Sequence, residues 1–327
     1  MVASKAGNGK LSSKALLAGL AALLADLEPG VHGCFRDLIP AAAVRKEREE
    51  RAERWMRELG SRLVLKEEPK GVAGACAWSP LTWDSERFGF PAARLEFLLA
   101  REDSVRRAIL RTTLERSHEA GIQHLTARLD SSDMSGAHAL VDAGFEMVDG
   151  ILTFGLRIDD RMASAEVTGP AEIGLFKKDQ VEGIVELASK AYQFDRFHAD
   201  SALRPGVADR IHAEWLRNSC EGGAADVVIT AARDKQVLGF VTVKLDSEIE
   251  RISGVRLATI MLVATAEAAR GMGIGTAMTQ YALRLLAGRR VRGVRVGTQL
   301  RNIAASRLYE SCGFRLIGSG LTFRKLL

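Results

Sequence analysis

Cysteine is scarce in this chain of 327 residues, which has four: Cys34, Cys76, Cys220 and Cys312. They stand far apart and form no C-x-x-C pair, the spacing typical of redox motifs and of zinc sites. The sequence therefore predicts neither a disulfide framework nor a bound metal. We expect reduced thiols, as in cytosolic proteins.

Long hydrophobic runs are also lacking. The apolar stretch "ALLAGLAALLA" at 15–25 is far shorter than the roughly 20 residues that a membrane-spanning helix needs. Lysines precede it, as in a secretory signal, but no A-x-A cleavage site follows, and Asp26 and Glu28 come soon after it. We predict an amphipathic helix that ends at Pro29–Gly30, in a cytoplasmic protein without a membrane partner.

Neither sign of charge dominates. Lys and Arg number 46 against 41 Asp and Glu, which gives a formal charge of +5 and a pI near 9.1. This balance permits an anionic ligand such as a nucleotide or coenzyme A, and it is equally typical of a mildly basic cytosolic protein. Because the basic residues are spread along the chain, we expect no nucleic-acid partner. The charged stretch 44–59 places Ala52, Trp55, Met56 and Leu59 on one helical stripe, so its charges form a solvated face.

The length of the chain is typical of about two domains. Its 47% hydrophobic and 27% charged residues are ordinary for a soluble globular protein that buries a sizeable core. Residues 159–168, "DDRMASAEVT", are polar and low in bulky apolar side chains, so we place the domain boundary there. The predicted organisation is an N-terminal helical segment at 1–60, a first domain at 61–160 and a second domain at 169–327.

Strands and helices alternate in both halves. Short apolar and β-branched runs between turns predict strands, and apolar residues with a helical period predict helices. Three of the strands in the second half follow one another as antiparallel neighbours. The predicted strands are 61–66, 71–78, 93–100, 123–129, 151–158, 172–177, 226–234, 236–246, 255–265, 291–299 and 319–326, and the predicted helices are 104–120, 135–143, 181–192, 274–287 and 303–312.

An internal repeat relates the two halves. The stretch "GFEMVDGILTF" at 144–154 aligns without a gap with "GFRLIGSGLTF" at 313–323, at an offset of 169 residues. The same offset places Arg101 opposite Arg270, but "EDSVR" stands where the second half has "GMGIG", and Leu140 stands opposite Tyr309. We interpret this as a duplication in which the first copy has lost what the glycines and the tyrosine do.

Glycines at 271, 273 and 275 occupy alternate positions in "ARGMGIGTAM", between a predicted strand and a predicted helix. Glycine costs backbone entropy, so this arrangement needs a reason. Glycines there let a backbone close around phosphate oxygens at a helix N-terminus, which attracts anions. A tight strand-to-helix turn is the alternative. Thr276 excludes the dinucleotide pattern G-x-G-x-x-G, and the lack of a following lysine excludes a Walker loop.

The pattern Arg270-Gly271-x-Gly273-Ile274-Gly275 resembles the acetyl-CoA loop of the GNAT N-acetyltransferase superfamily. A second stretch, "NIAASRLYESCGF" at 302–314, resembles the N-x-x-A-x-x-L-Y-x-x-x-G-F motif of that family. One predicted helix and one predicted strand separate the motifs, as in the family. The resemblance covers about residues 172–327. It implies an α+β fold of two tandem GNAT-like domains, each a mostly antiparallel mixed sheet flanked by helices, with a degenerate first copy.

The resemblance also implies which residues bind acetyl-CoA, the co-substrate. Backbone groups of Val263 and Thr265 would meet the pantetheine arm, and Asn302 and Ala305 would contact the coenzyme. Asn302 also stands where its side chain can cap the following helix. The family often has a proline shortly before the arginine, where this chain has "TAEAAR". The loop residues that would hold the pyrophosphate are Arg270, Gly271, Met272, Gly273, Ile274, Gly275 and Thr276.

Tyr309 is the predicted catalytic residue. When an amine attacks the thioester, a thiolate leaves, and a positioned phenol can protonate it as a general acid. Ala305, Leu308 and Tyr309 fall on one face of a helix, so a packing role in the core is the alternative.

Two stretches give weaker evidence for the residues that bind the amine acceptor. In "YQFDRFHAD" at 192–200, His198 is a candidate base or substrate contact, with a structural histidine as the alternative. Arg196 is a candidate phosphate clamp, with a surface salt bridge as the alternative. With "LTWDSERFGFPAARLEF" at 81–97, this stretch is similar to dTDP-fucosamine acetyltransferases. That resemblance implies that Trp83 and Phe88 help to shape the region near the acceptor, with core packing as the alternative. Phe197, in the same cluster as Arg196 and His198, is a further candidate substrate contact.

We therefore expect an acetyl-CoA-dependent N-acetyltransferase. The preferred acceptor is the primary amine of a nucleotide-linked amino sugar. The alternatives are another small amine, a protein amino group, or a non-catalytic acyl-CoA-binding sensor. A small molecule is the expected partner, and a homodimer is one assembly that we consider.

Overall fold

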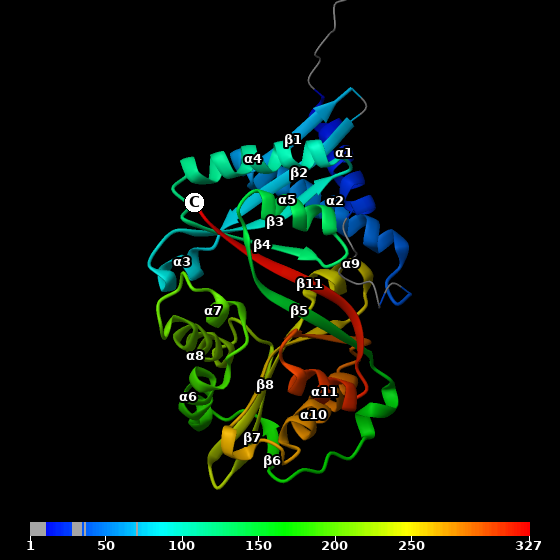
Figure 1. Cartoon of the computed structure of the whole chain (residues 1–327). Helices are drawn as coiled ribbons and strands as arrows, with labels where there is room; N and C mark the ends of the chain where they lie inside the picture. The colour runs from blue at the N-terminus through cyan, green and yellow to red at the C-terminus, as the bar shows by residue number, and fades with distance from the viewer. Residues whose placement is uncertain (1–10, 28–34, 36, 70) are drawn as a thin grey trace, which may run out of the picture. The chain divides into compact units, whose positions relative to one another are not determined.

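The computed structural model describes residues 11–27, 35, 37–69 and 71–327 (Figure 1). Cys34 and the helix end predicted at Pro29–Gly30 lie outside these residues. The chain divides into two compact units. Of the described residues, unit 1 contains 11–27, 44–69, 71–146 and 323–327, and unit 2 contains 35, 37–43 and 147–322.

Unit 1 is a four-stranded mixed sheet in the order β1-β2-β3-β4, covered by helices. Strands β1, β2 and β3 are antiparallel neighbours, and β3 pairs with β4 in parallel. The predicted N-terminal helix is confirmed, because Leu20, Leu23 and Leu24 of α1 are fully buried. The elements that form unit 1 or begin in it are α1 (Ser13–Leu27), α2 (Ala41–Glu58), η2 (Gly60–Arg62), β1 (Leu63–Glu68), β2 (Gly71–Pro80), α3 (Thr82–Phe88), β3 (Ala92–Ala100), α4 (Asp103–Glu119), β4 (His124–Asp130), α5 (Met134–Asp142) and β5 (Glu146–Arg157).

Unit 2 is a mixed sheet with the strand order β5-β10-β9-β8-β7-β6, in which β9 and β10 are parallel and the other neighbours antiparallel. The elements of unit 2 after β5 are η3 (Asp160–Ser164), β6 (Glu172–Leu175), η4 (Lys178–Gln180), α6 (Val181–Ala191), α7 (Arg196–Ala199), α8 (Val207–Cys220), β7 (Val227–Arg233), β8 (Gln236–Leu245), α9 (Ser247–Ser253), β9 (Leu257–Thr265), η5 (Glu267–Ala269), α10 (Ile274–Gly288), β10 (Gly293–Gln299), α11 (Ile303–Ser311) and β11 (Arg315–Leu326).

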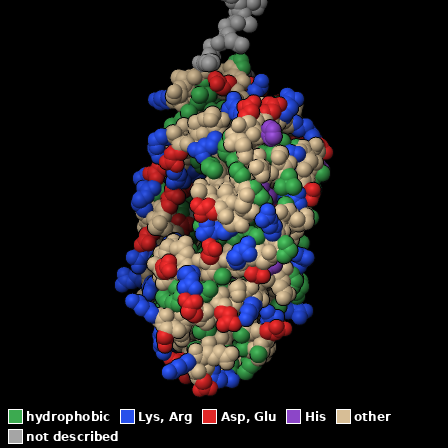
Figure 2. Space-filling view, turned by 90° about the vertical axis from the view of Figure 1, so that its left-hand side faces the viewer, with side chains coloured by type: hydrophobic (Ala, Val, Ile, Leu, Met, Phe, Trp, Pro, Cys, Tyr) green, Lys and Arg blue, Asp and Glu red, His purple; other side chains and the backbone are tan. Residues whose placement is uncertain are grey.

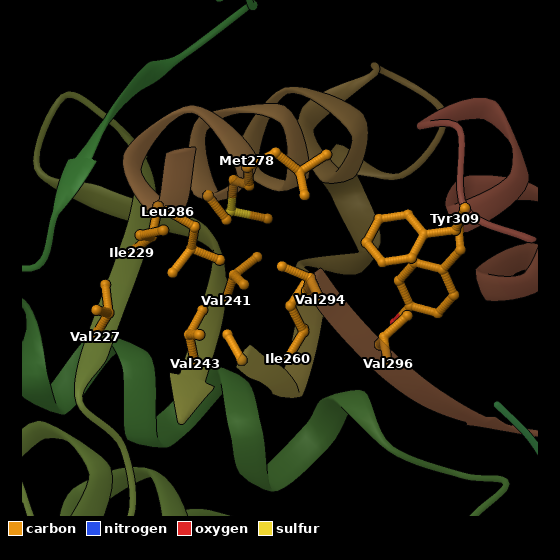
Figure 3. Packing of buried hydrophobic residues seen from close by; sticks show 14 of the residues in the cluster. Val227, Ile229, Val241, Val243, Ile260, Met278, Leu286, Val294, Val296 and Tyr309 are labelled. Atoms are coloured by element: carbon orange, nitrogen blue, oxygen red, sulfur yellow. The ribbon is translucent and has the colours of Figure 1, made fainter. Parts of the chain in front are cut away.

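Helices cover both faces of the sheet in unit 2. One face buries Ile229, Val241 and Ile260 beneath α10, next to α11 (Figure 3). The opposite face buries Val228 and Phe240 against α6 and α8. Alternate strand residues thus enter two separate cores, as a sheet covered on both faces requires.

The fold class predicted from the sequence is confirmed: each half is a mixed sheet flanked by helices. The internal repeat is visible in the elements themselves, because β4, α5 and β5 match β10, α11 and β11 residue for residue at the offset of 169. The offset fails before α4 and α10. Two residues join β3 to α4, whereas Ala266–Gly273 joins β9 to α10, so Arg101 and Arg270 are not equivalent.

The compact units do not follow the boundaries drawn from the sequence. Strand β5 belongs to the first repeat, yet residues Ile151–Arg157 pair antiparallel with β10 in unit 2. The last residues of the second repeat, Phe323–Leu327, belong to unit 1. The ranges 61–160 and 169–327 stay a proposal for the two sequence copies. The stretch 81–97, for which the sequence predicts no helix, contains the short helix α3.

Lys and Arg side chains are interspersed with Asp and Glu side chains over the face seen in Figure 2. This mixture agrees with the even spread of charge along the sequence. In the part of the chain that the structure describes, no helix is both long enough and apolar enough to cross a membrane.

Candidate active site

A β-bulge interrupts strand β9 at Met261. In the pairing with β8, Val243 faces Ile260 and Thr242 faces Leu262, so Met261 is the extra residue. The bulge reverses which side chains enter which core: Ile260 lies in the core beneath α10, whereas Leu262, two residues later, lies in the core against α6 and α8. Bulges re-aim side chains in this way and often stand beside active sites.

Strands β9 and β10 part at the bulge. Their parallel ladder runs from Leu257–Gly293 to Ile260–Val296, and that pair is its last. Beyond that pair, residues Leu262–Thr265 of β9 pair with β8 and with no other described strand. The opened edge of β9 therefore offers main-chain groups to an extended ligand.

The glycine loop follows directly. Gly271 has a φ of 75° and Gly273, the N-cap of α10, a φ of 77°, which are left-handed values that favour glycine. A Cβ at either position would meet no described atom within 4 Å. No described side chain caps α10 at Gly273, and its first turn carries no acidic residue. The loop thus presents open backbone N–H groups at the positive end of a 15-residue helix.

The third glycine has a different role. A Cβ on Gly275 would lie 3.4 Å from Leu308 Cδ2 and 3.6 Å from Thr265 Oγ1, so this position permits close packing of α10 on α11 and β9. Its backbone is helical. The sequence pattern does not distinguish the three glycines. In the structure, Gly271 and Gly273 permit the turn, and Gly275 permits close packing.

The predicted cofactor residues differ in exposure. Arg270, Gly271, Met272 and Gly273 are exposed, whereas Ile274 is 1% exposed and anchors the start of α10 in the core. The remaining ones are all partly buried: Val263, Thr265, Gly275, Thr276, Asn302 and Ala305.

Asn302 caps α11, as the sequence predicts. Its side chain accepts a hydrogen bond of 3.1 Å from the backbone N–H of Ala305. Asp133 does the same for Gly136 at the equivalent position of the first copy. The cap is therefore common to both copies and is independent of any ligand.

Tyr309 lies on α11, at the edge of the core beneath α10 and beside Val296 of β10 (Figure 3). It is 4% exposed, and its ring centroid is 5.9 Å from those of both Phe154 and Phe314. Burial, and the nearby Cys312, raise the pKa of the phenol above its ordinary value. The hydroxyl therefore stays protonated at neutral pH, as a proton donor requires.

A second tyrosine, which the sequence reading missed, reaches the opened strand. The Tyr192 hydroxyl donates a hydrogen bond of 3.3 Å to the Val263 carbonyl. Burial, followed by the nearby Tyr309 and Asp195, raises the pKa of Tyr192 well above its ordinary value. The Tyr192 phenol therefore stays protonated beside the opened part of β9.

The predicted acceptor cluster forms a network in unit 2. Asp195 caps α7 through the backbone N–H groups of Phe197 and His198. The two ring nitrogens of His198 lie 2.6 Å from Asp195 Oδ2 and 3.1 Å from Asp209 Oδ1. Asp195 thus raises the pKa of His198. Burial opposes ionisation of Asp195, but the histidines hold its pKa below its ordinary value.

His212 completes this network, and the sequence reading did not include it. The residue lies on α8, a helix that was not predicted, and it is 2% exposed. Its ring stacks on Tyr192 at 4.2 Å, and Nδ1 lies 2.8 Å from the carbonyl oxygen of Ala208. Burial lowers the pKa of His212. The buried residues Val207, Ile211 and Leu216, spaced along one face of α8, are the pattern that could have revealed this helix.

The other predicted acceptor residues make packing contacts. Phe197 is 7% exposed and its ring meets His212 edge-on, which favours a packing role. The guanidinium of Arg196 lies over the Phe197 ring at 4.2 Å. Trp83 belongs to unit 1, on α3, where the guanidinium of Arg87 covers its ring. Contact of these residues with an acceptor stays a prediction.

Unit 1 has the same strand geometry without the ligand loop. Strand β3 bulges at Glu96, and its parallel ladder with β4 ends at Arg94–Thr126. The two-residue connection to α4 ends in Glu102, and Asp103 occupies the first turn. Carboxylates there repel an anion. The first copy therefore keeps the opened strand and has lost the anion site.

Residues 182–314 match the model of the Acetyltransferase (GNAT) family. Two curated relatives are similar in sequence. A spore coat polysaccharide biosynthesis protein, SpsD, of Bacillus subtilis is 29% identical over 57% of this chain and 61% of its own length, so the match spans less than two thirds of that relative. A dTDP-fucosamine acetyltransferase of Escherichia coli is 26% identical over 72% of this chain and 91% of its own length.

A solved structure supports the fold. A tandem GNAT protein from the clavulanic acid biosynthesis pathway has a TM-score of 0.59, with 96% of both chains covered and 14% sequence identity. Its coverage extends the tandem arrangement to both halves of this chain.

Proposed function

We propose that residues 182–314, which match the model of the Acetyltransferase (GNAT) family, transfer the acetyl group of acetyl-CoA to the primary amine of a nucleotide-linked amino sugar. The observation that carries the proposal is the opened edge of β9, which leads directly into the exposed glycine loop at the N-terminus of α10. Because both features accept one long ligand with an anionic end, they fit a coenzyme better than a free phosphate.

The residues present fit coenzyme A. The space beside Gly271 and Gly273, and the uncapped start of α10, form a cradle for a pyrophosphate. Backbone groups of Val263 and Thr265 would align the pantetheine arm along β9. The carbonyl of Val263 already accepts the Tyr192 hydroxyl, so the amide N–H of Val263 is the group we assign to the arm.

The chemistry is direct transfer. The neutral amine nitrogen bonds to the thioester carbonyl carbon, the carbon–sulfur bond breaks, and the amine proton passes to solvent or a base. We assign to Tyr309 the donation of a proton to the leaving sulfur. Its burial supports this role, because the phenol stays protonated and water is kept from the reacting groups.

The acceptor class rests on the relatives. The relative named dTDP-fucosamine acetyltransferase aligns along 91% of its length, and the "DRFHAD" stretch folds into the network beside Tyr192. We therefore favour a nucleotide-linked amino sugar over other small amines or a protein amino group. We place the reaction in the cytoplasm, where Cys76, Cys220 and Cys312, which are free thiols in the structure, stay reduced.

The test is release of coenzyme A thiol from acetyl-CoA when candidate amines are added to the purified protein. We expect saturable release with dTDP-linked 4-amino sugars and little with free amino sugars, polyamines or lysine peptides. If thiol release is faster with a peptide or a simple amine than with the dTDP-linked sugars, the proposed acceptor class is wrong. Saturable binding of acetyl-CoA with no release for any amine would favour a sensor.

A further inference from the structure

Two histidine rings converge on one carboxylate oxygen in unit 2. Asp195 Oδ2 lies 2.6 Å from His198 Nδ1 and 3.8 Å from His212 Nε2. One donor atom from each of the three residues lies within 4.8 Å of the other two. Asp195 and His212 are buried, at 7% and 2% exposed. The sequence predicts no metal because the third residue stands on a helix that the sequence reading missed.

The far nitrogen of each ring is anchored. His198 Nε2 lies 3.1 Å from Asp209 Oδ1, and His212 Nδ1 lies 2.8 Å from the main-chain oxygen of Ala208. A histidine that binds a metal usually donates its other N–H to a carboxylate or a carbonyl, which fixes the ring and its tautomer. Because Nδ1 of His212 donates to Ala208, its Nε2 keeps a lone pair on the side of Asp195. His198 Nδ1 offers a lone pair there once a metal displaces the proton that it shares with Asp195.

One of the two distances is that of a hydrogen bond, since His198 Nδ1 lies 2.6 Å from Asp195 Oδ2, and the other leaves room for an ion. An imidazolium N–H that bonded to Asp195 would approach to about 2.7–2.9 Å, and the 3.8 Å separation of His212 is too long for that. Tetrahedral Zn²⁺ with ligands at about 2.0–2.1 Å holds its donor atoms about 3.4 Å apart. The separations of 2.6 and 3.8 Å bracket this value, so small side-chain rotations would complete the geometry.

We propose that Asp195, His198 and His212 bind one divalent cation of the zinc class. Two imidazoles and one carboxylate suit Zn²⁺, Co²⁺ or Ni²⁺ and do not suit Mg²⁺ or Ca²⁺, which prefer oxygen ligands. The ion balances the charges of Asp195 and Asp209. It ties α7 to α8 behind Tyr192, whose ring stacks on His212. This site goes beyond the proposed acetyl transfer and does not depend on it.

The experiment measures zinc directly. The full chain, stripped by a chelator and dialysed, is titrated with ZnCl₂ in excess Mg²⁺, and bound metal is counted by mass spectrometry. We expect one Zn²⁺ per chain and a higher melting temperature with zinc. His212→Gln and His198→Ala should each weaken binding at least tenfold, and His118→Gln, on the exposed surface of α4, should leave it unchanged.

Co²⁺ gives a second readout that separates a site from loose surface binding. Wild type should show visible absorption from tetrahedral Co²⁺, and folded His212→Gln, checked by circular dichroism, should not. Absence of saturable Zn²⁺ binding in the wild type would overturn the proposal. Equal binding by wild type and His212→Gln would overturn it too. Neither outcome bears on acetyl-CoA binding, so failure of this proposal leaves the proposed function standing.

Discussion

The hydroxyl of Tyr192 lies 3.3 Å from the carbonyl oxygen of Val263, a residue 71 positions away in the chain, and donates a hydrogen bond to it. Tyr192 directly follows α6, and Val263 lies on β9 just beyond the bulge. Because burial keeps the Tyr192 phenol protonated, it remains a donor. One hydrogen bond therefore joins the strand that would hold the pantetheine arm to the loop proposed for the acceptor.

Removing that hydroxyl should affect both substrates. Tyr192→Phe keeps the ring and its stacking on His212 but leaves the Val263 carbonyl without this donor. We expect acetyl-CoA to bind about tenfold more weakly, a loss of about 1.4 kcal/mol, and unfolding to become easier by about 1 kcal/mol. Calorimetry and urea unfolding measure the two effects. Ser253→Ala removes a hydroxyl-to-carbonyl bond on α9, together with the bond that this hydroxyl accepts from the Val255 N–H, and should lower stability alone. Unchanged coenzyme affinity in Tyr192→Phe would contradict the link.

The loop glycines should respond unequally to substitution. Gly273→Asp places a side chain at a φ of 77° and a negative charge in the proposed pyrophosphate cradle, so acetyl-CoA binding should fall at least 100-fold. Gly275→Ala adds a methyl 3.4 Å from Leu308, so the loss should be tenfold or less. Gly288→Ala, at the exposed end of the same helix, is the control. Equal losses at positions 273 and 275 would show that backbone conformation does not set the site.

The phenol of Tyr309 should be needed for a high kcat. Tyr309→Phe keeps the packing against Phe154 and Phe314 but removes the proton donor, so kcat should fall about 100-fold or more while KM for acetyl-CoA stays within threefold. Steady-state thiol release measures both constants. Tyr281→Phe on α10 is the matched control for loss of a hydroxyl. An unchanged kcat in Tyr309→Phe would leave Tyr309 as a core residue only.

Each chain should bind one molecule of acetyl-CoA. Unit 1 keeps the bulge and the parted strands but has a two-residue connection and the carboxylates of Glu102 and Asp103 at the start of α4, with Leu140 where unit 2 has Tyr309. Calorimetric titration should therefore give a stoichiometry near one, and Gly273→Asp should reduce it to none. A second equivalent that survives this substitution would place a coenzyme in unit 1.

The protein should lose stability in alkali through Cys76. Burial raises the pKa of this thiol from 9.0 to about 12. Above pH 9 the unfolded chain releases the proton while the folded chain keeps it. The free energy of unfolding therefore falls as pH rises, by at most about 1.4 kcal/mol per pH unit for this thiol. Urea unfolding between pH 8 and 11 measures the slope. It should be shallower for Cys76→Ala, and identical slopes would exclude Cys76.

Local sequence signals predicted much of this structure. The structure confirms the apolar stripes of α1, α2 and α6, the three antiparallel strands before the loop and the Asn302 cap. Each depends on residues within one or two helical turns or along one strand. Helix α8 was missed although Val207, Ile211 and Leu216 mark its apolar face, because the polar residues His212 and Ser219 are buried on that face too.

The sequence by itself determined the motif: the spaced glycines, the capped helix and the tyrosine that follow one another in the order of the GNAT family. Tertiary structure alone decided that Met261 forms a bulge, that β5 pairs with β10, and that Tyr192 and His212 come to the opened strand and to Asp195. The physical reason is the range of the interactions. Helix caps and turns form between near neighbours, whereas strand partners and contacts across tens of residues depend on how whole elements pack.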